Sequence, residues 1–440
     1  MTNKISLSYL RDAALKNDAI SPVLYSEYGV NLGLRDPEGR GVLTGLTNIS
    51  KVIGAGDVNG KRVPCEGELW YRGYRIGDLI TGPDNDTMEA EKIAYLLLSG
   101  EMPTEAEEMV FRSTLSYCRH LPPNFTRDVI MKAPSDDIMN NMMRSILTLA
   151  SYDDLARDTS LDNVIFQCLR LIAGLPVLAA YSYHAYNYYN MEGSMYIHKP
   201  DSKLSTAENL LRMLRPDMQF TPLEAKVLDA ALILHMEHGG GNNSTFTTRV
   251  VTSSGSDTYS TMAAAMASLK GPKHGGANIK VMEMMEDIRQ HVRDYDDEEE
   301  ITAYLDKILK REAFDGKGLI YGIGHAIYTL SDPRERIFKS YVEYLAEEKG
   351  RQEDLKLYQA VEKLAPQLLM SRAVTPKPVC PNVDFYSGFV YDMLGIPQEL
   401  YTAIFAIARI VGWSAHRIEE LICTEKIIRP AYMSVMKEKQ

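Results

Sequence analysis

From about residue 87 to residue 420 the chain is a succession of segments with the spacing of amphipathic helices, and this succession limits the fold most. The stretch TMEAEKIAYLLLSGEMPTEAEEMVFRSTLSYCRHL predicts two helices, separated by Gly100 and Pro103. Similar periodicity predicts helices within 140–190, 205–238, 256–269, 276–312, 333–370 and 386–420. No repeat of fixed period accompanies them, which argues against a solenoid. We therefore expect a large all-α protein.

The first 70 residues have a different composition. GVLTGLTNISKVIGAG (41–56) and GKRVPCEGELWYRGY (60–74) are rich in Gly, Val and Thr. Such stretches are typical of short strands and turns. We therefore expect short β segments near the N-terminus.

Composition and charge exclude several classes of protein. The 440 residues are 45% hydrophobic and 24% charged, which is typical of a folded soluble protein with a large core. The net charge of −11 argues against sequence-independent binding to nucleic acid, which needs a clustered basic surface. An anionic ligand would therefore need positive charge concentrated at its site.

The cysteines and the apolar segments predict a cytoplasmic protein. No C-x-x-C pair occurs, so neither a disulfide framework nor a cysteine-built zinc site is indicated. The N-terminal 20 residues lack an apolar signal core, and the run LIAGLPVLAAY (171–181) is too short to span a bilayer and contains Pro176. We expect no membrane partner. The cysteines are Cys65, Cys118, Cys168, Cys380 and Cys423.

One predicted helix, TPLEAKVLDAALILHMEHGGG (221–241), ends in histidines. Thr221 is expected to be its N-cap, Glu224 completes a capping box, and the helix is expected to stop at Gly239. His235 and His238 then lie beside the apolar stripe and point inward. They could be core histidines that cap the last carbonyls. A metal site is a weaker interpretation, because only Glu237 lies nearby as a further ligand.

Three further motifs place polar side chains beside glycine, proline or a helix end. GPKHGGAN (271–278) surrounds His274 with glycines, which let another group approach the backbone closely. GIGHAIYTLSDPRER (322–336) contains His325 and Arg334, and PNVDFYSGFVYDMLGIP (381–397) places Asp384 at the start of a short helix. Each motif alone is also typical of a loop or a cap. Together they match the needs of carbon-acid chemistry on an anionic substrate.

The order of these motifs resembles the citrate synthase family. The resemblance runs from YRGYRIGDL (71–79) and EKIAYLLLSGEMPTEAE (91–107), through the motifs above, to FAIARIVGWSAH (405–416) and KIIRP (426–430), and covers over four fifths of the chain. Members condense an acyl-CoA, usually acetyl-CoA, with a 2-oxo dicarboxylate, usually oxaloacetate, and then hydrolyse the thioester. The resemblance implies a CoA thioester as co-substrate and no bound cofactor or metal.

The resemblance also implies a domain organisation and an assembly. A large helical domain is expected from both ends of the chain, 1–278 and 387–440. A small domain, roughly 279–386, is expected to close over the substrates. Members are homodimers, so we expect a homodimer or a multimer of dimers.

By the same resemblance, the catalytic residues are His274, His325 and Asp384. His274 is expected to hydrogen-bond the thioester oxygen as the enol forms, and Asp384 to remove the methyl proton. A carboxylate is a weak base in water, so this step needs a desolvated base and a donor aimed at the oxyanion. His325 is expected to polarise the oxaloacetate carbonyl.

The substrate-binding residues also follow from matching positions. His238 is expected to bind oxaloacetate, and Arg334, Arg409 and Arg429 match the family's carboxylate-binding arginines. Planar guanidinium groups suit a dicarboxylate better than lysine would. Arg429 is expected to serve the partner subunit's site. Lys377 lies where some members bind a CoA phosphate, and a solvated loop lysine is the alternative.

The chain departs from the family's pattern in places. Some members carry a basic residue for CoA phosphate at the position of Thr329. GGGNNST (239–245) is richer in glycine than the version common in bacterial members. VIGAGDVNGKRVPCEG (52–67) is an apparent insertion. We expect neither of these two segments to touch the catalytic set.

Three alternatives remain open at this point. A non-catalytic scaffold would be expected to lose some of His274, His325 and Asp384, yet all are present. A metal-dependent lyase or oxidase would use His235 and His238. 2-Methylcitrate synthase differs by one methyl group on the acyl chain, which a pocket discriminates by only about 1–3 kcal/mol.

Overall fold

The computed structural model describes residues 8–36, 39–58, 61–85, 87–373, 377–423 and 425–436. The chain divides into two units, residues 1–46 and 47–440. The first unit contains α1 (Ser8–Asn17) and α2 (Pro22–Glu27), and neither helix buries a residue. The expectation of strands and turns was wrong for these two helices, whereas isolated β-bridges and turns follow at Leu32, Arg35 and Gly41. SYLRDAALKN contains strong helix formers, which the glycine-rich composition of the next residues masked.

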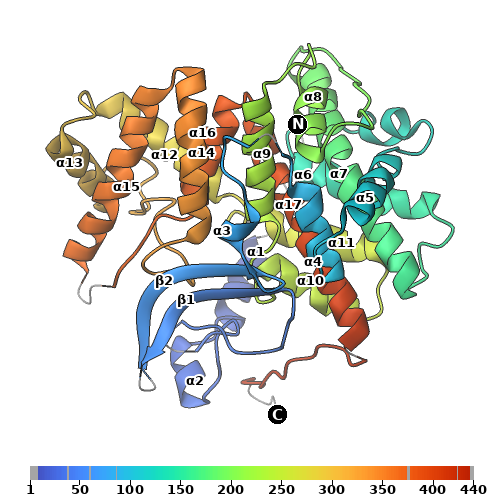
Figure 1. Cartoon of the computed structure of the whole chain (residues 1–440). Helices are drawn as coiled ribbons and strands as arrows, with labels where there is room; N and C mark the ends of the chain where they lie inside the picture. Colours follow the sequence, from blue (N-terminus) through green and yellow to red (C-terminus); the bar gives the residue numbers. More distant parts are fainter. Residues whose placement is uncertain are drawn as a thin grey trace. The chain divides into compact units, whose positions relative to one another are not determined.

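The second unit begins with a small antiparallel sheet in the order β1-β2-β3, as expected near the N-terminus. Its strands are β1 (Ser50–Val58), β2 (Lys61–Tyr71) and β3 (Tyr74–Arg75). Between the pairs Ile53–Glu68 and Ala55–Pro64 the register changes, so that residues 65–67 of β2 stand opposite Gly54 alone. This β-bulge lies in the middle of the β1–β2 hairpin, seen at the bottom of Figure 1.

The rest of this unit is helical, which confirms the all-α fold class. Each long helical stretch predicted from the sequence contains helices, and the longest are divided into two. The α-helices are α3 (Ile76–Leu79), α4 (Ala90–Ser99), α5 (Glu105–Cys118), α6 (Ile138–Leu149), α7 (Leu161–Asn190), α8 (Thr206–Leu214), α9 (Pro222–His235), α10 (Asn243–Ser253), α11 (Thr258–Lys270), α12 (Ala277–His291), α13 (Glu298–Leu309), α14 (Pro333–Lys349), α15 (Gln352–Arg372), α16 (Asp384–Met393) and α17 (Tyr401–Cys423).

Helix α10 was not predicted from its sequence. NSTFTTRVVTS is rich in β-branched and hydroxyl residues, which have low helix propensity. The helix packs against α11 and α17. Tertiary contacts therefore stabilise a helix that local propensity disfavours.

Two long helices organise the core. Helix α17 packs against α4, α7, α9, α10 and α11, and runs among them in Figure 1. Helix α7 is long and apolar enough to cross a membrane by length and composition, but 78% of its apolar window is buried inside the protein. Burial on this scale is typical of a core helix of a folded domain.

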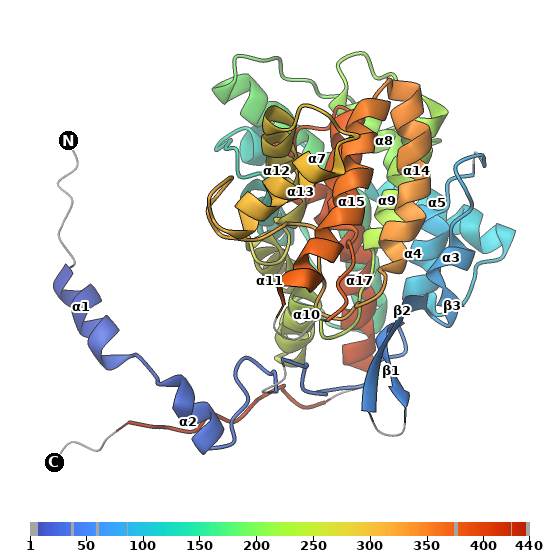
Figure 2. The ribbon, with the colours of Figure 1, turned by 90° about the vertical axis from the view of Figure 1, so that its left-hand side faces the viewer.

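Helices α12 to α16 form a second group. Helix α12 packs against α16, α13 against α15, and α14 against α15 and α16. They lie together on the left of Figure 1 and face the viewer in Figure 2. Helix α14 joins this group to the rest of the unit through contacts with α9 and β2. The predicted small domain, 279–386, covers most of this group, and its boundaries stay a prediction.

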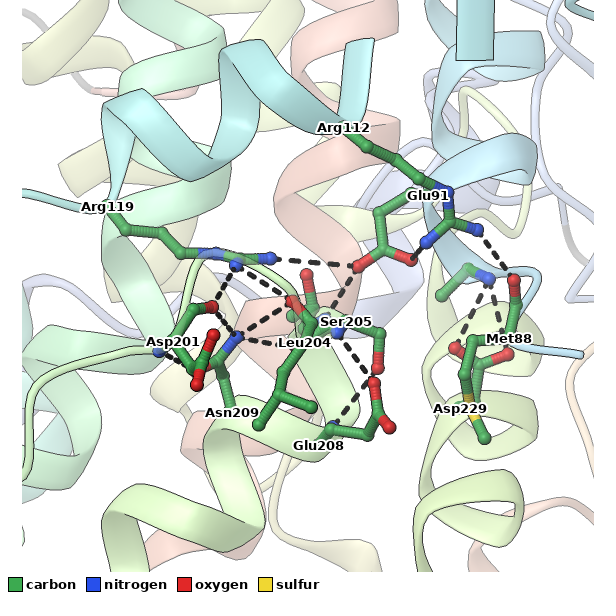
Figure 3. A network of polar contacts seen from close by, with 12 residues as sticks. Met88, Glu91, Arg112, Arg119, Asp201, Leu204, Ser205, Glu208, Asn209 and Asp229 are labelled. Atoms are coloured by element: carbon green, nitrogen blue, oxygen red, sulfur yellow. Dashed lines mark hydrogen bonds and ion pairs between the residues drawn. The ribbon is translucent and has the colours of Figure 1, made fainter. Parts of the chain in front are cut away.

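Buried charges in the other helical group are joined in one network (Figure 3). Glu91 of α4 is 2% exposed, and its carboxylate pairs with Arg112 at 3.0 Å and accepts the Thr206 N–H at 2.6 Å. Arg119 lies 4.0 Å from Glu91 and donates to two backbone carbonyls, and Asp229 of α9 accepts the N–H groups of Glu89 and Ala90 at the start of α4. These contacts connect α4, α5, α8 and α9.

Candidate active site

The histidines of α9 sit where the helix ends, but that end differs from the prediction. The Thr221 capping box is confirmed, whereas the helix stops at His235 instead of Gly239. The Tyr71 hydroxyl is the reason. It lies 3.1 Å from the Ile233 carbonyl and accepts the Glu237 N–H at 3.2 Å, and these two groups would bond each other in a continued helix. His238 therefore lies beyond the helix, where the residue is 6% exposed.

His238 and His325 come together across Tyr328. The His238 and His325 rings are edge to face with centroids 5.1 Å apart, and His325 stacks on Tyr328 at 4.8 Å. His238 Nε2 lies 3.1 Å from the Tyr328 hydroxyl. Burial and the Arg334 charge lower the pKa of His238 well below its usual value, so its ring is neutral at pH 7.

The backbone fixes the tautomer of His325. Its Nδ1 accepts the N–H groups of Ile327 at 3.1 Å and Tyr328 at 3.2 Å. A backbone N–H can only donate, so the proton of the neutral ring lies on Nε2. Burial and Arg334 lower the pKa of His325 to about 4. His325 is therefore a neutral donor through Nε2.

Asp384 is brought to His325 by pairing between two backbone segments. Ile323 and Pro381 form an antiparallel bridge, and the Asn382 side chain donates to the Gly324 carbonyl at 2.8 Å. Burial raises the pKa of Asp384 to about 6, although the charges of Arg334 and Arg409 oppose the shift. This carboxylate is partly desolvated, and so more basic than one in water.

His274 is held in the opposite tautomer. Ser244, in the first turn of α10, donates its backbone N–H to His274 Nε2 at 3.4 Å, and its Oγ lies 3.0 Å from the same atom. Since Nε2 accepts, the ring proton lies on Nδ1. Trp413 donates to Ser244 Oγ at 3.1 Å. Burial and Arg409 lower the pKa of His274 to about 4, so this ring is also a neutral donor.

Arg409 of α17 is a buried cation with a free donor. Its Nε donates to the His235 carbonyl at 2.6 Å, and its guanidinium lies 4.7 Å over the Phe405 ring. Its Nη1 is buried and has no hydrogen-bond partner in the part of the chain that the structure describes. Burial lowers its pKa to about 10, which leaves the group charged at pH 7. An unpartnered buried donor is costly, and suits an anionic ligand.

Arg334 is buried but paired. Asp332 accepts from its Nε at 3.0 Å and from its Nη2 at 2.6 Å. Burial alone would lower the pKa of Arg334, but the Asp332 carboxylate more than offsets this and raises it. Asp332 occupies one edge of the guanidinium fork, and the Nη1 edge is left for another acceptor.

Comparison with known proteins decides the family. The model of the family "Citrate synthase, C-terminal domain" matches residues 33–431. The chain belongs to the citrate synthase family.

The relatives of this chain have two different activities. It is 34% identical to the citrate synthase of Corynebacterium glutamicum over 83% of this chain and 79% of that protein. It is also 34% identical to the 2-methylcitrate synthase of Shewanella oneidensis over 84% of this chain and 90% of that protein. The family therefore implies an enzyme that condenses an acyl-CoA, and the acyl group is not settled by identity.

Solved structures of the family share the fold. The ternary complex of carboxymethyl coenzyme A and oxaloacetate with citrate synthase from Thermoplasma acidophilum gives a TM-score of 0.74 at 27% identity, over 93% of this chain and 97% of that one. Citrate synthase from Pyrobaculum aerophilum gives 0.73 at 29% identity, over 92% of this chain and 95% of that one.

Two residues expected from the citrate synthase motifs are not brought to this cluster within the chain. Arg429 lies in the extended C-terminal segment, where it is exposed and has no hydrogen bond or ion pair with the residues that the structure describes. The nearest anchor of that segment is the Ile428 N–H, which donates to Ser253 Oγ at 3.0 Å. Lys377 is exposed and follows three residues outside the described ranges. Their roles stay predictions.

Sequence reasoning missed several residues of the citrate synthase site. Tyr328 and Ser244 were quoted within motifs without a role, although each contacts a predicted histidine. Glu237, considered only as a weak metal ligand, instead accepts from His416 Nε2 at 2.9 Å and from Ser50 at 2.8 Å. His416 and Arg409 lower its pKa to about 2 despite burial. The sequence signal that could have revealed this pair was Glu237 in the helix-end motif together with His416 in the GWSAH segment.

The described ranges contain no group of three or more His, Cys, Asp or Glu side chains that could hold a metal. The polar groups of the cluster instead offer N–H donors and one carboxylate base. His274, His325 and Arg409 can donate, and the Asp384 carboxylate can accept a proton. This set suits proton abstraction next to a carbonyl and binding of a carboxylate.

Proposed function

We propose that this protein is a citrate synthase, which condenses acetyl-CoA with oxaloacetate and hydrolyses citryl-CoA to citrate and CoA. The observation that carries the proposal is the pair of neutral imidazoles, His274 and His325. Each is fixed as a hydrogen-bond donor by backbone N–H groups, in one cluster with the Asp384 carboxyl of raised pKa. The proposed enzyme works in the cytoplasm without a bound cofactor.

In the first step, Asp384 removes a proton from the acetyl methyl group. Negative charge develops on the thioester oxygen, which accepts a hydrogen bond from His274 Nδ1–H. A neutral imidazole donor is well suited to stabilising such an enol. Because Ser244 and Trp413 fix the position of the ring, little reorganisation is needed during the reaction.

In the second step, the enol attacks the 2-oxo carbon of oxaloacetate. The carbonyl oxygen gains negative charge beside His325 Nε2–H and takes up one proton to become the hydroxyl of citryl-CoA. This proton balances the one that Asp384 removed from the methyl group. Water then cleaves the thioester and releases the CoA thiol. The oxaloacetate carboxylates are proposed to bind His238, the free Nη1 of Arg409 and the open edge of Arg334.

Steady-state kinetics with two acyl-CoA substrates test this proposal. We expect CoA release that depends on oxaloacetate, citrate as the product by mass spectrometry, and a higher kcat/KM for acetyl-CoA than for propionyl-CoA by about 10- to 200-fold. A reversed preference would make the protein a 2-methylcitrate synthase, the activity of the Shewanella oneidensis relative. Absence of CoA release with both substrates would contradict the proposal.

We also propose that the enzyme is a homodimer in which Arg429 completes the partner's site. Its exposed position in the single chain is consistent with a role outside that chain. Mixing Asp384→Asn chains with Arg429→Ala chains then gives heterodimers with one intact site. If half of the dimers are mixed, activity should recover to about a quarter of wild type. A purified heterodimer as inactive as its parents would show that Arg429 acts within its own subunit.

Lys377 is proposed to bind a CoA phosphate. Lys377→Ala should then raise the KM for acetyl-CoA and leave the KM for oxaloacetate unchanged, because an exposed lysine contributes mainly charge. Equal KM values for wild type and variant would make it a solvated loop lysine.

A further inference from the structure

The base of the β1–β2 hairpin is bound to the segment that carries His238. Ser50 and Tyr71, which face each other across the two strands, both contact this segment. Ser50 Oγ donates to the Glu237 carboxylate at 2.8 Å, and the Tyr71 hydroxyl accepts the Glu237 N–H. These bonds fix the chain directly before His238.

The bulge of the same hairpin is pressed against the segment between His325 and Arg334. A Cβ at Gly54 would overlap the backbone carbonyl of Ile327, and a Cβ at Gly67 would overlap the Ser331 carbonyl and lie 2.7 Å from the Tyr328 ring. A side chain at either position would therefore push the two segments apart. The expectation that GGGNNST does not touch the catalytic set was wrong, because Ser244 contacts His274. The insertion 52–67 contacts the backbone of the loop that follows His325.

Hydrogen bonds hold this contact together. Thr329 Oγ1 donates to the Gly54 carbonyl at 2.9 Å, and the Gly67 N–H donates to Ser331 Oγ at 3.1 Å. Glu66 accepts from Ser331 and pairs with Arg336 at 2.8 Å. The bulge thus presents Glu66 and Gly67 to a segment more than 260 positions further along the chain.

The two contacts lie on one rigid strand pair. Four residues of extended chain separate Ser50 from Gly54, or roughly 13 Å. At one end the hairpin holds the His238 segment, and at the bulge it holds the loop whose N–H groups fix His325. The His238 and His325 rings meet at 5.1 Å between these two attachments.

We propose that the β1–β2 hairpin is a positioning element for the oxaloacetate half of the site, with Gly54, Gly67 and Thr329 as its positioning residues. It positions the His325 loop against His238. The donor to the oxaloacetate carbonyl and the groups that bind the carboxylates can then contact the same oxaloacetate molecule. None of the three residues is proposed to touch substrate. This inference rests on the proposed function.

Glycine substitutions test the proposal. Gly54→Ala and Gly67→Ala should each raise the KM for oxaloacetate and its calorimetric Kd by about tenfold or more, because small misplacements of binding groups are costly. The KM for acetyl-CoA at saturating oxaloacetate should change by less than about twofold, since His274 is held by α10 and not by the hairpin. Gly56→Ala is the matched control. Gly56 lies in β1 with Gly54, and a Cβ there would meet Val63 at 3.7 Å and Cys65 at 4.0 Å, both ordinary contacts.

A second pair of variants covers the case in which the alanine variants do not fold. Thr329→Val removes the bond to the Gly54 carbonyl with little change of shape, and should raise the oxaloacetate KM by about 2- to 10-fold, the effect expected for one neutral hydrogen bond. Thr329→Ser keeps the hydroxyl and should restore the wild-type value.

The outcomes separate this inference from the proposed function. A wild-type enzyme that neither binds oxaloacetate nor releases CoA would overturn the proposed function, and the hairpin's role with it. An active wild type whose folded Gly54→Ala and Gly67→Ala variants match Gly56→Ala would overturn the hairpin's role alone. Equal oxaloacetate KM values for Thr329→Val and Thr329→Ser would do the same.

Discussion

Two regions of the molecule bury charged side chains, and they differ in whether these side chains have hydrogen-bond partners. In the network of Figure 3, the polar groups of Glu91, Arg112, Arg119 and Asp229 all meet partners among the described residues. In the site cluster, Arg409 Nη1 and Glu237 Oε2 are buried with no hydrogen-bond partner in the described part of the chain. Burial of a charge alone therefore does not mark a site. An incomplete buried charge points to a ligand only where it lies among the other site groups, because Arg417 Nε and Glu335 Oε1 are also buried without a hydrogen-bond partner in the described ranges.

The two regions should respond in opposite ways to the loss of a charge. A satisfied network stabilises the fold, since removing one partner strands the other in the interior. In the site cluster, a buried donor without an acceptor destabilises the free protein, and the bound substrate supplies that acceptor. The predictions below use this contrast, from the largest expected effect to the smallest.

Removing the catalytic groups should give the largest effect. We expect Asp384→Asn and His274→Ala each to lower kcat by about 10²- to 10⁴-fold while oxaloacetate still binds by calorimetry, because a general base or an enol donor is lost. Asp392→Asn is the control, since Asp392 lies on the same helix but is exposed and pairs with Arg351. Turnover in either variant equal to that of the control would refute the assigned roles.

Breaking the network should lower stability instead of turnover. Glu91→Gln leaves Arg112 and Arg119 without their buried carboxylate, and should cost about 3–5 kcal/mol in the free energy of unfolding. Denaturant unfolding measures this cost, and kcat per folded enzyme should stay within about twofold of wild type. Glu101→Gln, at an exposed position, is the control. A variant with wild-type stability would show that the network contributes little to the fold.

Removing the unpaired cation should weaken substrate binding more than the fold. We expect Arg409→Gln to raise the oxaloacetate KM by about 10- to 100-fold, the effect of a lost charge-assisted hydrogen bond. Arg417, on the same helix, donates through Nη1 and Nη2 to Thr252, Thr261 and the Ser256 carbonyl, and only its Nε is without a hydrogen-bond partner among the described residues. Arg417→Gln should therefore lower stability and leave the KM unchanged. Equal oxaloacetate KM values for Arg409→Gln and Arg417→Gln would contradict the assignment of Arg409 as the substrate-binding cation.

The pH dependence of kcat/KM should report Asp384, because this ratio reflects the free enzyme. Burial raises the pKa of Asp384 to about 6, and the base acts only when ionised, so kcat/KM should rise with pH through about 6 and then level off. Below pH 6 it should fall about tenfold per pH unit. His274 and His325, with pKa values of about 4, stay neutral and should add no step between pH 5 and pH 8. Full activity at pH 5 would show that Asp384 is not the base.

The sequence predicted the structural features that depend on residues close together in the chain. Helical periodicity located most helices, and the capping box at Thr221 set the start of α9 correctly. The histidine and arginine motifs were recognised as an ordered set, and the comparisons confirm the family that they indicated. Such features are encoded within a few turns of chain, where spacing is informative.

Contacts between distant segments were not predictable in this way. The end of α9 depends on Tyr71, 162 positions earlier, and the His325 loop depends on Gly54 and Gly67 of the hairpin. The partners that fix the two imidazole tautomers are backbone N–H groups, which carry no signature in the sequence. Helix α10 depends on packing that overrides its composition. In each case tertiary structure decides what local pattern leaves open.

Thermal denaturation with and without oxaloacetate tests the central contrast most directly. A ligand that binds only the folded state raises Tm. We predict that oxaloacetate at one fixed concentration raises the Tm of wild type and of Glu91→Gln by the same amount, the latter from a lower starting value, and that it raises the Tm of Arg409→Gln much less. An equal oxaloacetate shift in Arg409→Gln, or its loss in Glu91→Gln, would contradict the claim that the incomplete charge, and not the satisfied network, receives the substrate.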